Sequence, residues 1–301
     1  MTRFLSVCLN PTFQRTVLLN RLEKAEVNRA SYARLDASGK GVNVSRVLQQ
    51  LGAEVKHLTH LGPGKEEFLR LCRLDNLEII GIDSPSPIRT CITLLDREER
   101  STTEVIEPTE NLDADTVDTV RRAFTRELID TDWVILSGSK APGYPENLFA
   151  DFCREAQDAG IPVLADYRGE ELLASLPFRP AVVKINLVEF AATFLPDLKV
   201  SEADDTSALP DVEKKLQELS GKGSAYVLTR GAREILLADN GILDRVSPPG
   251  ISPVNTIGSG DSVAAGTAFT LAGGTGLKEA VIEGARYGAA NAELLKPGSI
   301  F

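Results

Sequence analysis

Short apolar runs alternate with longer amphipathic segments along this chain, and this alternation restricts the fold more than any other feature. Buried strands are expected at residues 4–9, 55–61, 133–136, 162–165, 181–185 and 225–229. Amphipathic helices are expected at residues 42–51, 66–74, 114–128, 146–159, 188–194 and 212–219. Uniformly apolar strands separated by helices are typical of parallel sheets that are covered on both faces. The sequence therefore predicts an α/β fold with a doubly wound, mostly parallel sheet flanked by helices.

Two regions interrupt this alternation. Residues 16–35 and 89–106 contain consecutive strand-like segments with charged turns and no helix between them. We expect their strands, within about 12–36 and 88–107, to pair into a small sheet that stands off the main body. Its exposed face would be buried by covering a substrate or by self-association. The polar stretch at 201–210 is interpreted as a connection, so residues 1–301 are predicted to form one domain.

Charge and composition exclude several classes of function. The chain has 33 basic and 43 acidic residues and a net charge of −10, so we expect no nucleic-acid binding. No apolar run approaches the roughly 20 residues of a membrane-spanning helix, and the N-terminus leads directly into a strand-like segment. These features predict a cytoplasmic protein without a membrane partner. The four dispersed cysteines and two histidines favour neither a zinc site, nor a disulfide framework, nor a histidine relay.

The strongest chemical signal is the segment NTIGSGDS at 255–262, which precedes a helical run of small residues at 263–272. Glycines at a loop-to-helix junction let backbone N–H groups converge on an anion, and the helix dipole adds to the attraction. Asp261 falls in the first turn, where a carboxylate can take a proton from a hydroxyl held above the loop. The alternative is that Ser259 or Asp261 only caps the helix.

A second glycine cluster, ASGKGVNVSR at 37–46, also opens a helix. Its spacing matches neither the phosphate-binding P-loop nor the dinucleotide fingerprint. The glycines allow the backbone to approach a polar ligand closely, and Lys40 and Asn43 offer donors to hydroxyls or phosphate. Taken alone, the cluster is also compatible with a tight turn.

The two loops, in this order and at this separation, resemble those of the PfkB (ribokinase-like) carbohydrate kinases, and most of all the branch of 1-phosphofructokinases and tagatose-6-phosphate kinases. The resemblance covers nearly the whole chain. Further matching segments are NPT at 10–12, RT at 89–90, SGS at 137–139, DYRGE at 166–170, KIN at 184–186 with Glu189, and TRG at 229–231. The resemblance implies a ribokinase-like fold in which the two stand-off regions form a lid, which in this branch often also makes a homodimer interface.

The resemblance also implies roles for individual residues. Asp261 would be the general base, and the backbone N–H groups of Gly258, Ser259 and Gly260 would form an anion hole. The sugar phosphate would contact Gln14, Gly39, Lys40, Asn43, Arg89 and Ser139. ATP would contact Lys184, Asn186, Thr229, Gly231, Asn255 and Gly288. Mg²⁺ would lie near Glu189, bound through water.

The chain departs from the family pattern at several of these places. Gln14 stands where the family has an Asp that accepts hydrogen bonds from sugar hydroxyls, and Ser38 replaces the first glycine of the GGKG segment. Ile185 replaces a proline on the nucleotide side. Lys140 replaces a leucine, and it is either exposed or a contact for an acidic substrate. These changes leave the identity of the sugar open.

Together these features predict an ATP- and Mg²⁺-dependent kinase. The expected acceptor is a hydroxyl of a phosphorylated ketose such as fructose 1-phosphate or tagatose 6-phosphate. One alternative is a kinase of an unphosphorylated sugar or nucleoside, in which Arg89 and Lys40 would have no phosphate to bind. The other is a catalytically silent protein that binds a sugar phosphate.

Overall fold

The main sheet of the protein is doubly wound, as the sequence predicts. The computed structural model describes residues 2–200 and 206–301, and the predicted connection at 201–210 falls partly outside them. Within the described residues the sheet order is β13-β12-β11-β10-β9-β8-β1-β4-β5. The strands are β1 (Arg3–Val7), β4 (Glu54–Leu61), β5 (Glu78–Asp83), β8 (Trp133–Ser137), β9 (Val163–Asp166), β10 (Val182–Asn186), β11 (Ala225–Arg230), β12 (Arg233–Asp239) and β13 (Ile242–Val246). In this order, every pair of neighbours from β11 to β5 is parallel, whereas β12 runs antiparallel to both of its neighbours, β11 and β13.

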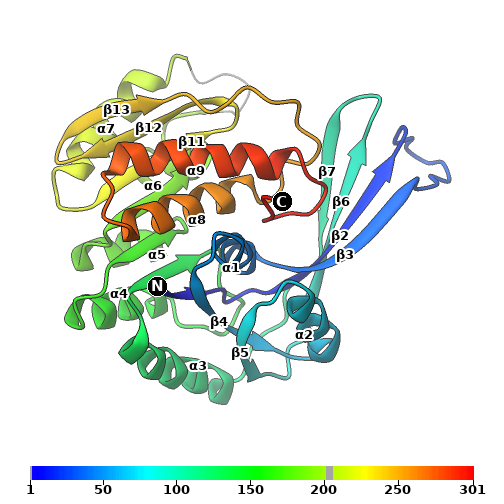
Figure 1. Cartoon of the computed structure of the whole chain (residues 1–301), viewed down its shortest axis with the longest axis horizontal. Helices are drawn as coiled ribbons and strands as arrows, with labels where there is room; N and C mark the ends of the chain where they lie inside the picture. The colour runs from blue at the N-terminus through cyan, green and yellow to red at the C-terminus, as the bar shows by residue number, and fades with distance from the viewer. Residues whose placement is uncertain (1, 201–205) are drawn as a thin grey trace.

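Alternate side chains of the strands supply two cores, one on each face of the sheet. Leu5 and Leu136 face one core, whereas Phe4 and Ile135 face the other, as the two-residue period of a strand requires. The first core is covered by α3 (Ala114–Glu127), α4 (Leu148–Asp158), α5 (Glu170–Ser175), α6 (Leu187–Phe194) and α7 (Leu209–Ser220). The second core is covered by α1 (Lys40–Gln50), α8 (Ser259–Ala272) and α9 (Leu277–Ala292) (Figure 1).

Helices α8 and α9 pack at very short range because small residues line their contact. A Cβ atom on Gly284 would lie 2.4 Å from the Thr267 hydroxyl oxygen, so no larger residue fits there. Short 3₁₀ segments follow α3 and α5, at Leu128–Asp130 and Leu176–Phe178. The close α8–α9 contact fixes the N-terminus of α8 relative to the sheet, and with it the loop that carries Asp261.

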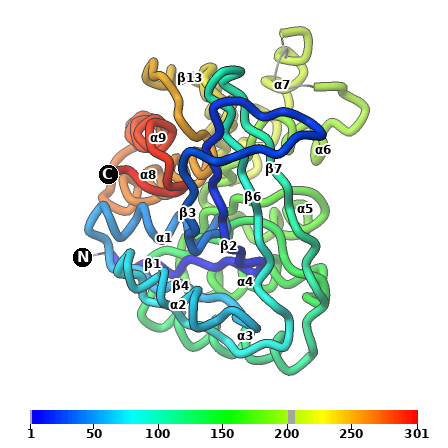
Figure 2. Tube along the Cα trace, turned by 90° about the vertical axis from the view of Figure 1, so that its right-hand side faces the viewer, coloured from blue at the N-terminus to red at the C-terminus, as the bar shows by residue number. Residues whose placement is uncertain are grey.

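A second, four-stranded sheet forms the predicted lid. Its strands are β2 (Thr12–Leu19), β3 (Tyr32–Ser38), β6 (Arg89–Asp96) and β7 (Ser101–Ile106), in the order β3-β2-β6-β7. Figures 1 and 2 show this sheet standing away from the helices of the body. Helix α2 (Lys65–Leu74) supports its base, where Phe13 meets Phe68 edge to face. We refer to these four strands as the lid.

The structure corrects several sequence predictions at the level of elements. Residues 20–31 form a twelve-residue loop between β2 and β3, which is longer than the charged turn expected within the consecutive strand-like segments of 16–35. Strands β5, β12 and β13 and helix α9 were not predicted. The four cysteines are unpaired and buried. Among the described residues, the helices are all too short or too polar to cross a bilayer.

Candidate active site

The candidate site lies at the carboxyl edge of the parallel strands, where doubly wound sheets bind their ligands. Strand β9 ends at Asp166 and β10 carries Lys184 close to its end. Helix α1 brings Lys40 and Asn43 from one side, and the first turn of α8 brings Asp261. The two sequence loops, more than 200 residues apart, therefore meet at this edge.

Asp261 is a buried carboxyl that, within residues 2–200 and 206–301, accepts a side-chain hydrogen bond from one donor. Its side chain lies in the first turn of α8 and is 6% exposed, and the Asn43 Nδ2 donates to its Oδ2 at 2.8 Å. Burial and the negative charge of Asp166 raise the pKa of Asp261 to about 6, against the opposite effects of Lys40, Lys184 and the Asn43 hydrogen bond. At neutral pH the group is thus mostly ionised and accepts a proton readily.

The loop before α8 presents backbone amides at a helix N-terminus. Gly258 caps the helix with a φ of 84°, a conformation that favours glycine. The Ser259 amide already donates to the Thr256 carbonyl at 3.2 Å. The Gly260 amide lies in the first turn of α8, where N–H groups have no acceptor within the helix. A Cβ on Gly260 would lie 2.9 Å from the Lys184 Nζ. An anion here would therefore meet the Gly260 amide and the ammonium group of Lys184.

A cluster of two lysines and two carboxylates adjoins this loop, and its Asp166 and Lys184 are buried. Asp166 is fully buried and accepts from Lys184 at 3.3 Å and from Lys40 at 3.2 Å. Burial alone would raise the pKa of Asp166, but the two lysines hold it below its usual value. Lys40 also reaches the Glu189 Oε1 at 3.4 Å. Asp166 was missed as a site residue, although an Asp ending an apolar strand at this edge is a usable signal.

The residues predicted to contact ATP fall into two groups. Asn186 caps α6 and shares a capping box with Glu189, and Thr229 pairs with Asn186 across β10 and β11. Gly231 follows in a left-handed turn with open space around its Cα. These residues lie together at the strand ends.

Asn255 and Gly288 lie behind the loop and shape it. Asn255 donates to the Leu295 carbonyl at 2.9 Å and accepts from the Ile257 amide at 3.1 Å. Gly288 is buried against α8, where a Cβ would lie 2.6 Å from Val263. A further side chain, Asn291, was not predicted, and its Nδ2 donates to the Ile257 carbonyl at 2.9 Å.

The residues predicted to contact the sugar surround the base of the lid. Gly39 lies so close to Cys8 that a Cβ would be 2.8 Å from the sulfur. Burial raises the pKa of the Cys8 thiol, and the charges of Asp261 and Arg89 both act on it, which places both near this turn. The Arg89 Nε is buried and has no hydrogen-bond partner among the described residues.

Two other residues predicted to contact the sugar have partners within the protein. The Gln14 Nε2 donates to the Thr93 hydroxyl at 2.7 Å, across two lid strands. The Ser139 hydroxyl accepts from the Asn10 Nδ2 at 3.2 Å. Gln14 is buried in the lid, and its neutral amide links two lid strands. An Asp at this position would place a negative charge inside the sheet.

Comparison with known proteins identifies the family of this chain. Residues 10–299 match the sequence model of the pfkB family of carbohydrate kinases. The chain belongs to the pfkB family. Members are ATP-dependent carbohydrate kinases, and this chain is one of them.

Solved structures share the fold of this pfkB kinase at low sequence identity. Escherichia coli phosphofructokinase-2, crystallised with potassium, has a TM-score of 0.83 at 22% identity over 98% of this chain and 94% of that chain. A Thermotoga maritima protein named "possible 1-phosphofructokinase" has a TM-score of 0.86 at 22% identity over 98% and 93%. These likenesses confirm the ribokinase-like sheet and its lid as the fold.

Lys140 has a structural role in this pfkB kinase. Its Nζ donates to the carbonyls of Pro145 at 2.6 Å and Glu146 at 2.9 Å, and it pairs with Glu171 at 3.0 Å. The side chain is buried beside the ring of Phe149, so it is neither exposed nor free to meet an acidic substrate.

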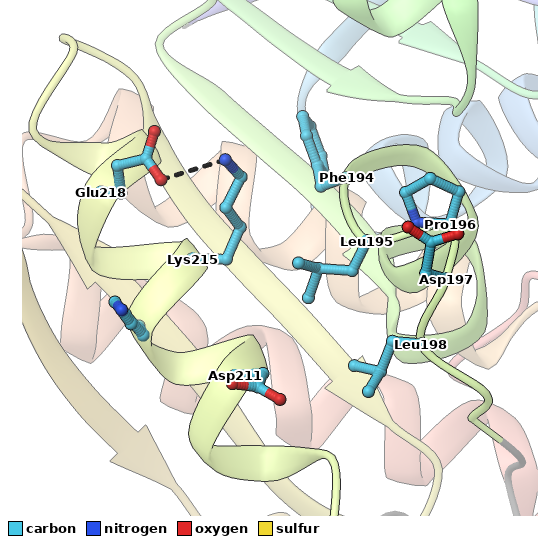
Figure 3. A pocket seen from close by; sticks show the side chains of 9 residues that line it. Phe194, Leu195, Pro196, Asp197, Leu198, Asp211, Lys215 and Glu218 are labelled. Carbon is cyan, nitrogen blue, oxygen red and sulfur yellow. Dashed lines mark hydrogen bonds and ion pairs between the residues drawn. The ribbon is translucent and has the colours of Figure 1, made fainter.

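A separate hollow of about 530 Å³ lies on the outer side of the kinase, between residues 194–198 and α7 (Figure 3). Its polar lining includes an ion pair between Lys215 and Glu218 at 3.0 Å. The lining shares no residue with the site around Asp261. The hollow is therefore separate from the candidate site at the strand edge.

Proposed function

We propose that this pfkB kinase transfers the γ-phosphoryl group of ATP to a hydroxyl of a phosphorylated ketose, with fructose 1-phosphate and tagatose 6-phosphate as the first candidates. The observation that carries the proposal is the buried Asp261 carboxyl at the start of α8. Burial and Asp166 raise its pKa to about 6, although two nearby lysines act in the opposite direction. Such a group has the location and the proton affinity of a general base near neutral pH.

In the proposed reaction Asp261 takes the proton of the acceptor hydroxyl as its oxygen attacks the γ-phosphorus. The bond between that phosphorus and the β,γ-bridging oxygen breaks, and ADP leaves. The amides of Gly258 and Gly260, with Lys184 beside them, stabilise the charge on the transferred group. Lys40, which forms ion pairs with Asp166 and Glu189, adds a second positive charge near the transferred group.

The donors at the end of β10 fit a magnesium ion that arrives with ATP. Asn186 and Glu189 provide oxygen atoms, the ligand type that Mg²⁺ prefers, and both side chains are fixed by the capping box. Mg²⁺ would be held near Glu189 through water, and when bound it would neutralise phosphate charge. Thr229 and Gly231 would border the same nucleotide.

Arg89 supports a phosphorylated acceptor over a free sugar. A buried guanidinium nitrogen without a partner is costly, and a sugar phosphate would supply the missing acceptor. Gly39, Asn43 and Ser139 would border the sugar, with Gln14 above it in the lid. Escherichia coli phosphofructokinase-2 has been crystallised with fructose-6-phosphate, which gives that protein a phosphorylated ketose as ligand.

We also propose that residues 1–301 act as one kinase domain and that two chains pair through their lids. The edge strand β7 is exposed along its whole length, and its Val105 and Ile106 are apolar. A structure of Escherichia coli phosphofructokinase-2 is described as tetrameric and inhibited, so that protein does self-associate. A cytoplasmic location remains a prediction.

The test is ADP release from Mg·ATP across phosphorylated ketoses, free sugars and nucleosides. We expect turnover with one phosphorylated ketose, and Asp261→Asn should lower kcat by about 10²–10⁴-fold with little change in ATP binding. Turnover only with a free sugar or nucleoside would replace this proposal by the first alternative. Melting shifted by a sugar phosphate without any turnover would establish a silent binding protein.

A further inference from the structure

A single buried arginine connects the catalytic loop region to three other parts of the chain. Arg46 lies in α1 and is 1% exposed. Its guanidinium donates to the Asn43 Oδ1 at 3.1 Å, to the Pro297 carbonyl at 2.8 Å and to the Ala37 carbonyl at 2.5 Å. Its Nε donates to the Asp75 Oδ2 at 2.7 Å. These four acceptors match the planar, multidentate geometry of arginine and exceed what a lysine can reach.

The contacts of Arg46 determine which way the Asn43 amide points. The Asn43 Oδ1 accepts from Arg46 and from the Ser38 hydroxyl, at 3.1 and 3.0 Å. Because two donors occupy the oxygen, the nitrogen is turned toward Asp261, to which it donates at 2.8 Å. A flipped amide would present oxygen to the carboxylate and would leave both donors facing an NH₂ group.

The C-terminal segment also packs against Asn43 and restricts its side chain. A Cβ on Gly298 would lie 2.4 Å from the Asn43 Cβ, so the C-terminal segment is packed directly on this residue. Lys296, from the same segment, pairs with Asp75 and lies 4.0 Å from Asp36 of the lid strand β3. Arg46 thus joins the lid, the end of α2 and the C-terminal segment around one amide.

We propose that Arg46, together with Ser38, is a positioning residue that fixes the Asn43 amide so that Asp261 is held ionised and oriented toward the acceptor hydroxyl. The proposal rests on the proposed role of Asp261 as the base. It also explains the departure of Ser38 from the glycine of the family pattern, because only a side chain there can supply the second donor.

The other groups around Asp261 are accounted for separately. Asp166 of β9, Lys40 of α1, Lys184 of β10 and the thiol of Cys8 are the titratable groups whose charges act with that of Asp261. Arg46 has hydrogen bonds to none of them among the described residues. A change at Arg46 therefore reaches Asp261 through Asn43.

The first experiment compares Arg46→Lys and Ser38→Ala with the wild-type enzyme, using the ketose phosphate and Mg·ATP. We expect kcat to fall by about 10-fold in Arg46→Lys and less in Ser38→Ala, with the KM for ATP unchanged. The acid limb of the pH profile should move up by about half a pH unit or more in both variants. An unchanged acid limb in Ser38→Ala, which alters no charge, would overturn the proposal even if Arg46→Lys does not fold.

The matched control is Gln50→Ala. Gln50 lies on the same helix and holds the same C-terminal segment, through the Ser299 hydroxyl at 2.9 Å and the Ile300 amide at 2.8 Å, but it does not contact Asn43. We expect it to lower thermal stability without moving the acid limb. If Gln50→Ala moves the limb equally, general loosening of the segment is the cause, and the proposal fails.

A second measurement does not depend on catalysis. The carboxyl of Asp261 is titrated by ¹³C NMR in protein labelled at aspartate, and Asp261→Asn assigns its signal. The pKa should rise in Ser38→Ala and Arg46→Lys and stay constant in Gln50→Ala. A shifted titration in a protein without turnover would refute the proposed kinase reaction and keep the positioning role, whereas an unshifted one would refute the positioning role alone.

Discussion

At the scale of single residues, Asp261 shows a conflict between catalysis and stability. Its pKa rises on folding from 3.8 to about 6, because burial and Asp166 disfavour the ionised form. The folded state therefore binds the proton more tightly than the unfolded state does. Above pH 6 the ionised carboxylate destabilises the fold, and this cost disappears as the pH falls toward 3.8.

We therefore expect Asp261→Asn to raise the free energy of unfolding by about 1–3 kcal/mol at pH 8. The gain should shrink between pH 6 and pH 4. Urea unfolding at pH 8 and pH 4.5 measures it, with Asp118→Asn, an exposed carboxyl of α3, as the control. A gain of equal size at both pH values would show that the buried charge of Asp261 does not destabilise the fold.

What the sequence reveals about the site also differs residue by residue. Local patterns identify Asp261, the glycines beside it and the Lys40–Asn43 turn. Helix capping, the helix dipole and turn geometry depend on a few neighbouring residues, so the sequence shows them directly. The partners of these residues are distant in the chain: Asn43 meets Asp261 across 218 positions, and Lys40 meets Asp166 across 126. Such pairings follow from the folded topology, and for that reason Asp166 and Arg46 were missed.

At the scale of elements, the lid is buried at its base and exposed along its outer edge. Strand β7 is exposed along its length, and β3 and β7 form the two edges of the small sheet. Because a sugar held at Asn43 and Arg89 would touch both the base of the lid and the body, binding should order these strands.

We expect slower amide exchange in residues 12–19, 32–38, 89–96 and 101–106 when a ketose phosphate and a non-hydrolysable Mg·ATP analogue are both present. Hydrogen exchange measured by mass spectrometry tests this, and the buried central strand β8 is the internal control, because we expect its amides to be protected with and without ligands. Equal exchange with and without ligands would show that the lid does not close on substrate.

The sequence also predicts elements unevenly, for physical reasons. Central strands such as β1 and β8 are apolar on both faces, so their composition alone identifies them. The hairpin of β12 and β13 was missed although Asn240 and Gly241, both with positive φ, form the turn that such hairpins favour. Helix α9 was missed because its glycines and alanines make a weak amphipathic pattern, while its packing needs small residues.

At the scale of the whole molecule, the exposed apolar residues of the lid bear on its assembly. Val105 and Ile106 are 51% and 56% exposed on the edge strand β7, which leaves backbone groups without a neighbouring strand. The net charge of −10 opposes unspecific association, so contact between copies requires a defined apolar surface. The lid provides one, and closing it over a substrate would bring its strands into the fixed geometry that pairing needs.

We therefore expect the wild-type protein to sediment as a dimer and Val105→Asp to sediment as a monomer at the same concentration, because the carboxylate would be buried unpaired in the interface. Ile129→Asp is the matched control, since Ile129 is 82% exposed in the 3₁₀ segment after α3, away from the lid. Sedimentation velocity over a concentration series distinguishes the two. A monomeric wild type, or loss of the dimer in Ile129→Asp as well, would place the interface elsewhere or remove it, and the lid would then serve the substrate alone.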